Sequence, residues 1–181
     1  MLEARKPELL WIELWFLQFL YLLCKTRKYK AVVKYFPHEV SDFEPVAYGL
    51  LCQDKSSNET WSTRYTLLLW MSMLVLIPFD LLTVDSGLVG AVGPDVEGKT
   101  GERSNIVDTV VSTCKEYLTD PSAVRDAAAV CLARLLARPD MDSSYLQSYL
   151  QWAADELDNH ITNAQPHSVF AVSLAYLFKF L

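Results

Sequence analysis

The residues of this sequence whose types and spacing come nearest to a chemical site lie in a glycine-rich stretch. Gly93–Thr100 matches G-x-x-x-x-G-K-[ST], the pattern of loops whose backbone N–H groups bind nucleotide phosphates. That mechanism requires a buried strand before the loop and a helix that begins at the lysine. Here the preceding Gly87–Val92 is short and interrupted by glycine, and Asp95 and Glu97 place negative charge where phosphate would bind. A flexible loop is therefore favoured, and a P-loop nucleotide-binding protein is kept as an alternative.

The other residue types that carry catalytic or metal chemistry are scattered along the chain. His38, His160 and His167 lie far apart, without the spacing of metal ligands. The four cysteines form no C-x-x-C pair and lie among apolar residues, which favours reduced, buried side chains. They are Cys24, Cys52, Cys114 and Cys131. The sequence therefore predicts no catalytic residue, no cofactor-binding residue and no metal site.

One local concentration of positive charge stands out in a chain whose net charge is −6. It consists of Lys25, Arg27, Lys28, Lys30 and Lys34. The simplest interpretation is a solvated end of a helix, where cations interact favourably with the helix dipole. The functional interpretation is an electrostatic contact for an acidic protein partner. The negative net charge argues against a general nucleic-acid binder, since phosphate neutralisation needs many clustered Lys and Arg residues.

The stretch 120–139 carries the clearest helix signals. Asp120 is placed to cap the first turn, and Pro121 follows at the helical position where a missing N–H is harmless. Apolar residues then recur at helical spacing on one face: Val124, Ala127, Ala128, Cys131, Leu135 and Leu136. The small side chains of Ala127–Ala129 would let another helix approach closely. This segment predicts a packed helix of the kind found in HEAT-type repeats.

The rest of the chain shows the same helical period and no convincing strand pattern. Helices are expected over about 7–26, 29–36, 42–53, 60–78, 104–118 and 143–159, and from about 166 onward. Ser104 is the expected cap of the fifth of these. The sequence therefore predicts an all-α, HEAT/armadillo-like solenoid of antiparallel helix pairs, with 1–181 as a single segment of a longer array. Five of the six glycines fall within 83–103, which predicts a flexible loop there.

Two apolar segments could be mistaken for membrane spans or a signal peptide. Residues 9–24 are interrupted by Glu13 and Gln18 and are followed by basic residues rather than a cleavage site. Residues 65–79 are uncharged but shorter than the roughly 20 residues that a span requires. A helix that is apolar on every side is typical of the centre of a packed helical protein. Both segments are therefore expected to be buried in the core, with no membrane span.

Several blocks of sequence resemble one protein family. They are YFPHEV at 35–40, EPV at 44–46, ETWSTRYTLLLW at 59–70, LIPFD at 76–80, RDAAAV at 125–130 and RPD at 138–140. These blocks resemble the tubulin-folding cofactor D family, and the resemblance covers most of residues 14–153. It implies a large cytoplasmic, microtubule-associated HEAT/armadillo solenoid.

The resemblance also implies a function and a set of partners. The family acts as a chaperone for β-tubulin, assembling and disassembling αβ-tubulin heterodimers with the tubulin-folding cofactors C and E and an ADP-ribosylation-factor-like small GTPase. It stimulates GTP hydrolysis by tubulin together with a partner cofactor, so this chain is expected to be no enzyme itself. No tubulin-contact residue carries over from the resemblance. The alternatives are a generic HEAT-repeat interaction scaffold and the P-loop protein at Gly93–Thr100.

Overall fold

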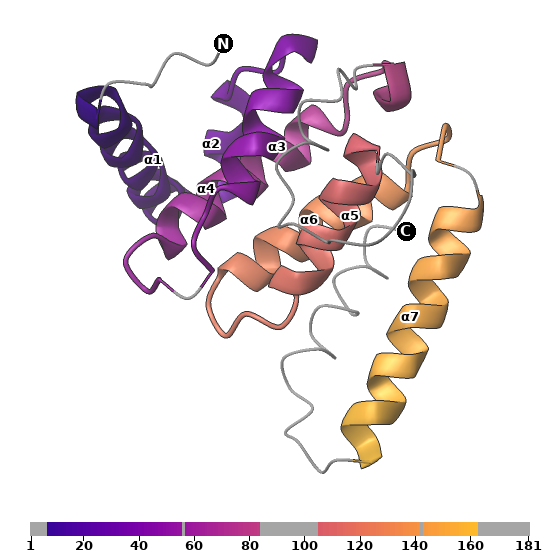
Figure 1. The fold of residues 1–181 in the computed structure, drawn as a ribbon. Coiled ribbons are helices and arrows are strands. Elements are labelled where there is room, and N and C mark those ends of the chain that lie inside the picture. The colour runs from indigo at the N-terminus through magenta and orange to yellow at the C-terminus, as the bar shows by residue number, and fades with distance from the viewer. Residues whose placement is uncertain (1–6, 56, 84–104, 142, 163–181) are drawn as a thin grey trace.

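The computed structural model describes residues 7–55, 57–83, 105–141 and 143–162, and these ranges contain helices and no strand (Figure 1). The α-helices are α1 (Pro7–Arg27), α2 (Tyr29–Val32), α3 (Phe43–Leu51), α4 (Trp61–Leu74), α5 (Ile106–Tyr117), α6 (Val124–Leu136) and α7 (Ser143–Thr162). Short 3₁₀ turns cover Val33–Tyr35, Val40–Asp42 and Leu81–Thr83.

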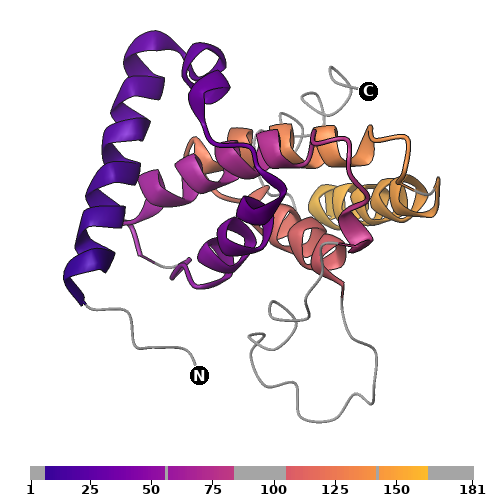
Figure 2. The same ribbon diagram turned by 90° about the horizontal axis from the view of Figure 1, so that it is seen from above.

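The helices are arranged as two pairs with flanking helices. α3 packs on α4 and α5 packs on α6, while α4 lies against α6 and α3 against α5 (Figure 2). Two layers result, one containing α4 and α6 and the other α3 and α5. α1 packs on α4 at one end, and α7 lies at the opposite end (Figure 1). The predicted all-α, HEAT/armadillo-like solenoid of paired helices is confirmed.

The contact between α4 and α6 is the most extensive between any two of the described elements. Every residue of α6 from Ala127 to Ala133 is buried, and three consecutive alanines let the α4 backbone come close. In α4, Leu68, Leu69 and Met71 are each at most 1% exposed. A helix segment that is apolar all round must be enclosed on every side, as expected for 65–79. α6 was expected to bury one apolar face, and it buries more than that face, with Ala129, Val130 and Leu132 also enclosed. The prediction of a buried segment at 65–79 is confirmed for α4, although Leu76 and Phe79 beyond its end are exposed.

Two arginines of the α6 region hold the carboxyl end of α4. Arg134 Nη1 donates to the Ser72 carbonyl oxygen at 2.9 Å. The Arg138 guanidinium donates to the carbonyl oxygens of Val75, Ile77 and Phe79 at 2.5, 2.7 and 2.6 Å. The last carbonyls of a helix have no partner within the helix, so the arginines supply donors to the Ser72 and Val75 carbonyls, while the Ile77 carbonyl also accepts from the Phe79 N–H at 2.8 Å.

The connection between α3 and α4 is held by a buried arginine. Arg64 is only 2% exposed, and its Nη1 donates to the Asp54 and Ser57 carbonyl oxygens at 2.7 and 2.9 Å and to the Thr60 hydroxyl at 3.1 Å. A buried charge is tolerated only where hydrogen-bond acceptors replace water. Arg64 therefore holds Asp54, Ser57 and Thr60 against the start of α4.

Two of the predicted helix starts are wrong. α6 begins at Val124, because Asp120 Oδ1 accepts from the Ser122 N–H at 2.8 Å and so closes a turn ahead of the helix. Asp120 is therefore not the cap of α6 that the sequence predicted. At the start of α5 the cap is Asn105, whose side-chain oxygen accepts from the Asp108 N–H at 2.7 Å, in place of the predicted Ser104. Both errors have the same origin, because several short polar side chains lie near each helix start and the sequence does not show which of them caps the first turn.

The expectation that 9–24 is buried on all sides is wrong for the described side chains of α1. Trp15, Phe16, Phe19 and Leu22 are all more than half exposed. The other side of the helix does pack, through Leu17, Leu20 and the buried Cys24. Cys52 also departs from the prediction, because it is exposed, whereas Cys24, Cys114 and Cys131 are buried, and all four are free thiols. No described helix combines the length and apolar composition needed to cross a bilayer.

Other predicted elements lie outside the described residues. The expected glycine-rich loop is described only at Thr83, which ends a 3₁₀ turn, and the helix expected from about 166 onward is not described.

Ala128→Glu is expected to lower the free energy of unfolding by several kcal/mol, because the new carboxylate would be buried without a partner between α6 and its neighbours. Asp126→Ala is the matched control, since Asp126 lies two residues away and its side chain is 39% exposed. Thermal unfolding, monitored by circular dichroism, gives the melting temperatures of the two variants. Equal melting temperatures for Ala128→Glu and the parent would contradict the burial of this helix face.

Arg138→Met should lower the free energy of unfolding by about 2–3 kcal/mol, because it removes the guanidinium donor from the Val75, Ile77 and Phe79 carbonyl oxygens, of which Ile77 alone keeps a backbone donor among the described residues, the Phe79 N–H. Arg125→Met is the control, because the Arg125 side chain donates to the neighbouring Asp126 carboxylate and to no backbone carbonyl of the described residues. Urea unfolding should show a smaller loss for the control, which gives up a hydrogen bond to one carboxylate and none to a described backbone carbonyl. Similar losses for the two variants would show that the carbonyl bonds do not stabilise the α4–α6 contact.

Candidate interaction surface

The residues that suggested chemistry do not form a described catalytic or metal site. Gly93–Thr100 lies outside the described residues, and the described ranges contain no strand that could precede a phosphate loop. His38 makes a local contact, from Nδ1 to the Phe36 carbonyl oxygen at 3.1 Å. Within the described part of the chain, no three His, Cys, Asp or Glu side chains gather as metal ligands. The interaction surfaces are therefore the features to consider.

The five predicted basic residues surround the junction of α1 and α2. Lys25 and Arg27 lie in the last turn of α1, Lys28 lies between the helices, Lys30 is in α2 and Lys34 in the 3₁₀ turn that follows. All five side chains are exposed, and none forms a salt bridge with a carboxylate of the described residues. We call these residues the basic segment. Its position matches the predicted helix end, and its cations are available to solvent.

Apolar anchors on either side hold the basic segment in place. Cys24 precedes it and is buried, and burial raises the pKa of the Cys24 thiol. Val33 and Phe36 are 3% and 4% exposed, and the Phe36 ring meets Trp70 edge-on at 6.2 Å. The Trp70 indole N–H donates to the Pro37 carbonyl oxygen at 2.6 Å. The charges therefore sit on a chain path that is fixed at both ends.

The turn between α1 and α2 contains an unusual backbone conformation. Lys28 has φ 67° and ψ 134°, and it has the one positive φ of a non-glycine residue among the described residues. A side chain with a Cβ is strained there. Just before it, the Thr26 hydroxyl donates to the carbonyl oxygens of Leu22 and Leu23 at 3.0 and 3.1 Å, which satisfies the end of α1. The reversal of direction at Lys28 packs α2 against α1 and leads the chain into the 3₁₀ turn Val33–Tyr35, which contacts α4.

The second surface is an apolar face of α1 that sequence reasoning missed. We call Trp15, Phe16, Phe19 and Leu22 the outer face; they are 69%, 57%, 55% and 55% exposed. The signal for it was present, because Trp15, Phe19 and Leu22 follow helical spacing while Leu17, Leu20 and Cys24 form a second apolar stripe on the opposite side. Hydrophobicity alone could not tell which stripe is covered.

The inner side of α1 is firmly attached to α4. The Tyr21 ring meets Trp61 and Tyr65 edge-on, with centroids 4.7 and 5.5 Å apart, and burial raises the pKa of Tyr65. The Thr66 hydroxyl donates to the Leu17 carbonyl oxygen at 3.1 Å. Edge-on aromatic pairs add stability beyond their buried area. The rotation of α1 is therefore fixed, and its outer face points away from the core.

A groove runs along the carboxyl ends of α4 and α6. Its volume is about 560 Å³, within the range of ligand pockets. It is lined by Leu76–Asp80 on one side and Arg134, Ala137, Arg138, Pro139 and Asp140 on the other. Arg134 and Arg138 already donate to carbonyl oxygens of the α4 end, and the hydrogen bond from Arg138 lowers the pKa of Asp140. The two arginines of the groove are thus already hydrogen-bonded across the α4–α6 contact.

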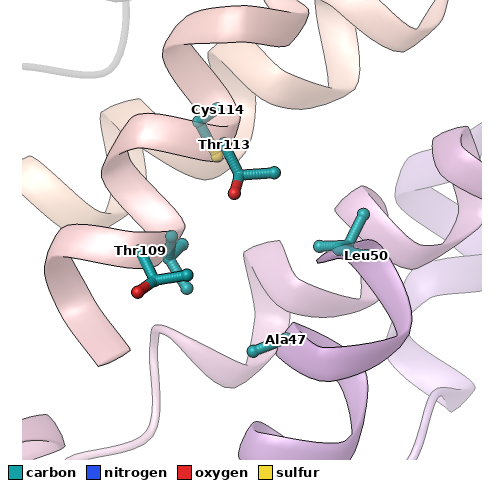
Figure 3. A pocket seen from close by; sticks show the side chains of 6 residues that line it. Ala47, Leu50, Thr109, Thr113 and Cys114 are labelled. Carbon is teal, nitrogen blue, oxygen red and sulfur yellow. The ribbon is translucent and has the colours of Figure 1, made fainter. Parts of the chain in front are cut away.

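A second hollow lies between α3 and α5 (Figure 3). Ala47 and Leu50 line it from α3, and Thr109, Val110, Thr113 and Cys114 from α5 (Figure 3). Its volume of about 10 Å³ is at the lower limit for one water molecule. It is a packing gap between the paired layers and offers no room for an organic ligand.

Comparison with known proteins agrees with this architecture. Residues 3–157 match the family described as "Tubulin-specific chaperone D-like, ARM repeat". This chain belongs to that family. The resemblance carried by the FPHEV, WSTRY and LIPFD blocks is thereby confirmed, and both the basic segment and the outer face lie within the matched region. No solved structure matches the chain.

Two curated members of the tubulin-specific chaperone D-like family show how much of a longer protein is represented. The chain is 32% identical over 121 residues to tubulin-folding cofactor D of Schizosaccharomyces pombe, covering 67% of this chain and 9% of that protein. It is 32% identical over 102 residues to tubulin-specific chaperone D of Dictyostelium discoideum, covering 54% of this chain and 7% of that protein. The matched regions thus span less than a tenth of each relative.

Lys28→Gly should raise the free energy of unfolding by about 1 kcal/mol, because glycine adopts the positive φ of this position without a Cβ clash. The Lys28 side chain is exposed, so no packing is lost. Lys30→Gly is the matched control. It removes the same charge from a helical residue and should be destabilising by up to about 1 kcal/mol. Chemical unfolding measures the free energy of unfolding of both variants. If Lys28→Gly is the less stable of the two, the turn at Lys28 is not strained.

Proposed function

We propose that this chain is a binding segment of a tubulin-folding cofactor, a scaffold for β-tubulin in the assembly and disassembly of αβ-tubulin heterodimers after the chaperonin. The family match over residues 3–157 carries this proposal, and the printed names of the two relatives support it. The architecture is compatible, because stacked helix pairs present extended surfaces that bind other proteins.

The partners and the setting belong to the same proposal. We infer that the longer protein works with the tubulin-folding cofactors C and E and with an ADP-ribosylation-factor-like small GTPase, in the cytoplasm and on microtubules. In this proposal the chain performs no catalysis of its own. It stimulates GTP hydrolysis by tubulin together with another cofactor, so the active site belongs to tubulin.

Within the described residues, the basic segment is the surface best suited to attract tubulin, which is acidic. Its five exposed cations carry no salt bridge to a described carboxylate, so binding a partner there would break no described ion pair. Charges at the rim of an interface act mainly on the rate of association and on its salt dependence. The basic segment is therefore proposed to steer the encounter with tubulin.

A pull-down of β-tubulin tests the proposed function directly. The 181-residue chain is immobilised beside the full-length S. pombe cofactor D, with an unrelated helical-repeat protein as the control. Retention of β-tubulin by the chain above the level of the control supports the proposal. Retention by the longer relative together with none by the chain would show that this segment is not a tubulin-binding part of the array.

Lys28→Glu/Lys30→Glu is expected to slow association with tubulin several-fold at low salt, with the effect shrinking above about 0.15 M as the screening length falls to about 8 Å. Both side chains are exposed, so the variant should fold normally. Lys30→Glu and Lys55→Glu are compared as single reversals inside and outside the basic segment. Because Lys55 pairs with Glu116, the folding of Lys55→Glu is first checked by circular dichroism. Stopped-flow or biosensor kinetics measures the rates. Equal slowing by the two single variants would assign the effect to net charge alone.

A further inference from the structure

The outer face of α1 and the basic segment adjoin one another and form one composite surface. By helical spacing of about 100° per residue, Lys25 and Arg27 lie in the turn after Leu22, one on each side of the outer face. Both cations are exposed. Figure 1 shows α1 at one edge of the molecule. The exposed apolar side chains of α1 therefore form a ridge that is bordered by positive charge at one end.

We propose that this composite surface docks an amphipathic α-helix of a partner protein, one that carries an apolar stripe with acidic residues beside it. Side chains at i, i+4 and i+7 on α1 supply the apolar contacts, in the manner of other helix-on-helix recognition. Charge complementarity selects an acidic partner, because Lys25, Arg27, Lys28, Lys30 and Lys34 form no salt bridge with a described carboxylate.

The size of the surface supports a partner of this kind. The exposed parts of Trp15, Phe16, Phe19 and Leu22 amount to on the order of 500 Å² of apolar surface, the size of the largest apolar patch on a typical monomer, which is often functional. A stable interface uses about 800 Å² per partner, so the apolar ridge needs the neighbouring basic segment to reach that size. Aromatic anchors with basic residues at the rim also match the usual composition of an interface centre and its border.

A protein helix fits these observations better than a membrane surface. A helix that lies on anionic lipid usually carries Lys and Arg along its polar side. In α1 the basic residues instead cluster in and after the last turn, and the side opposite the outer face is occupied by α4. The net charge of −6 also opposes approach to an anionic bilayer.

The inference extends the contact proposed for tubulin, and it rests on that proposal only for the identity of the partner. Its test uses no tubulin, so the two can fail separately. The probe is a synthetic helical peptide with leucines at i, i+4 and i+7 and glutamates beside them, labelled for fluorescence anisotropy. A second peptide has lysines in place of the glutamates. The protein is the complete 181-residue chain.

Two variants and one control separate the apolar and the charged contributions. Phe16→Gln/Phe19→Gln removes the centre of the outer face, and Lys25→Glu/Arg27→Glu reverses the charges beside it. Leu76→Gln/Leu150→Gln is the matched control, because both leucines are exposed apolar side chains outside α1. All substituted side chains are exposed, so circular dichroism should show unchanged folding for each variant.

The expected result is binding of the glutamate peptide to the parent and to the control, weakened about tenfold or more in each of the two α1 variants. The lysine peptide should bind the parent less tightly than the glutamate peptide. Equal binding by Phe16→Gln/Phe19→Gln and the parent would overturn the inference, as would equal affinity for the two peptides. Sedimentation with anionic vesicles that depends on Phe16 and Phe19 would replace it with a membrane contact. A dimer of the parent that these substitutions dissolve would replace it with self-association.

Discussion

The close packing of α4 against α6 is the constraint on which the rest of the structure depends. Ala127–Ala133 of α6 are buried without exception, and the consecutive small side chains let two helices meet with little space between their backbones. Once this contact forms, α3 and α5 are brought together on the other layer, since each is tied to its partner by a short connection. The guanidinium groups of Arg134 and Arg138 then close the carboxyl end of the joint by satisfying the carbonyls of Ser72, Val75 and Ile77.

The candidate interaction surface depends on that core indirectly, through the opposite side of α4. Tyr65 and Thr66 of α4 hold the inner side of α1, so the same helix that completes the core also sets the rotation of α1. The outer face and the basic segment therefore occupy a fixed position at one end of the array. In a chain with a net charge of −6, this end combines exposed cations with exposed aromatic rings. The segregation of charge gives one end of the molecule a preference for acidic partners.

The fold was largely predictable because helical periodicity is a local property of the sequence. The 3.6-residue recurrence of Val124, Ala128 and Leu135 identified buried positions of α6, although the structure also buries Ala129–Val130 and Leu132–Ala133. The same pattern located the other described helices within a few residues. The family blocks were recognisable for a different reason, since their order of residue types matches directly. The candidate site was only half predictable. Charge can be read from the residue types, so the basic segment was predicted from the sequence. The exposure of Trp15 and Phe19 depends on tertiary contacts and could not be read in that way.

The sequence by itself determined the helical class, the approximate helix bounds and the place of the positive charge, because each of these follows from neighbours within a turn or two. Only the tertiary structure decided which apolar stripe of α1 is covered, since that depends on contacts with Tyr65 and Thr66 far along the chain. The same holds for Arg138, whose carbonyl partners lie about sixty residues earlier in the chain, and for Arg64, whose charge is buried by its own loop. The periodic pattern shows that α1 has two apolar stripes, but it does not show which of them packs on the core. Only contacts with residues far along the chain decide that.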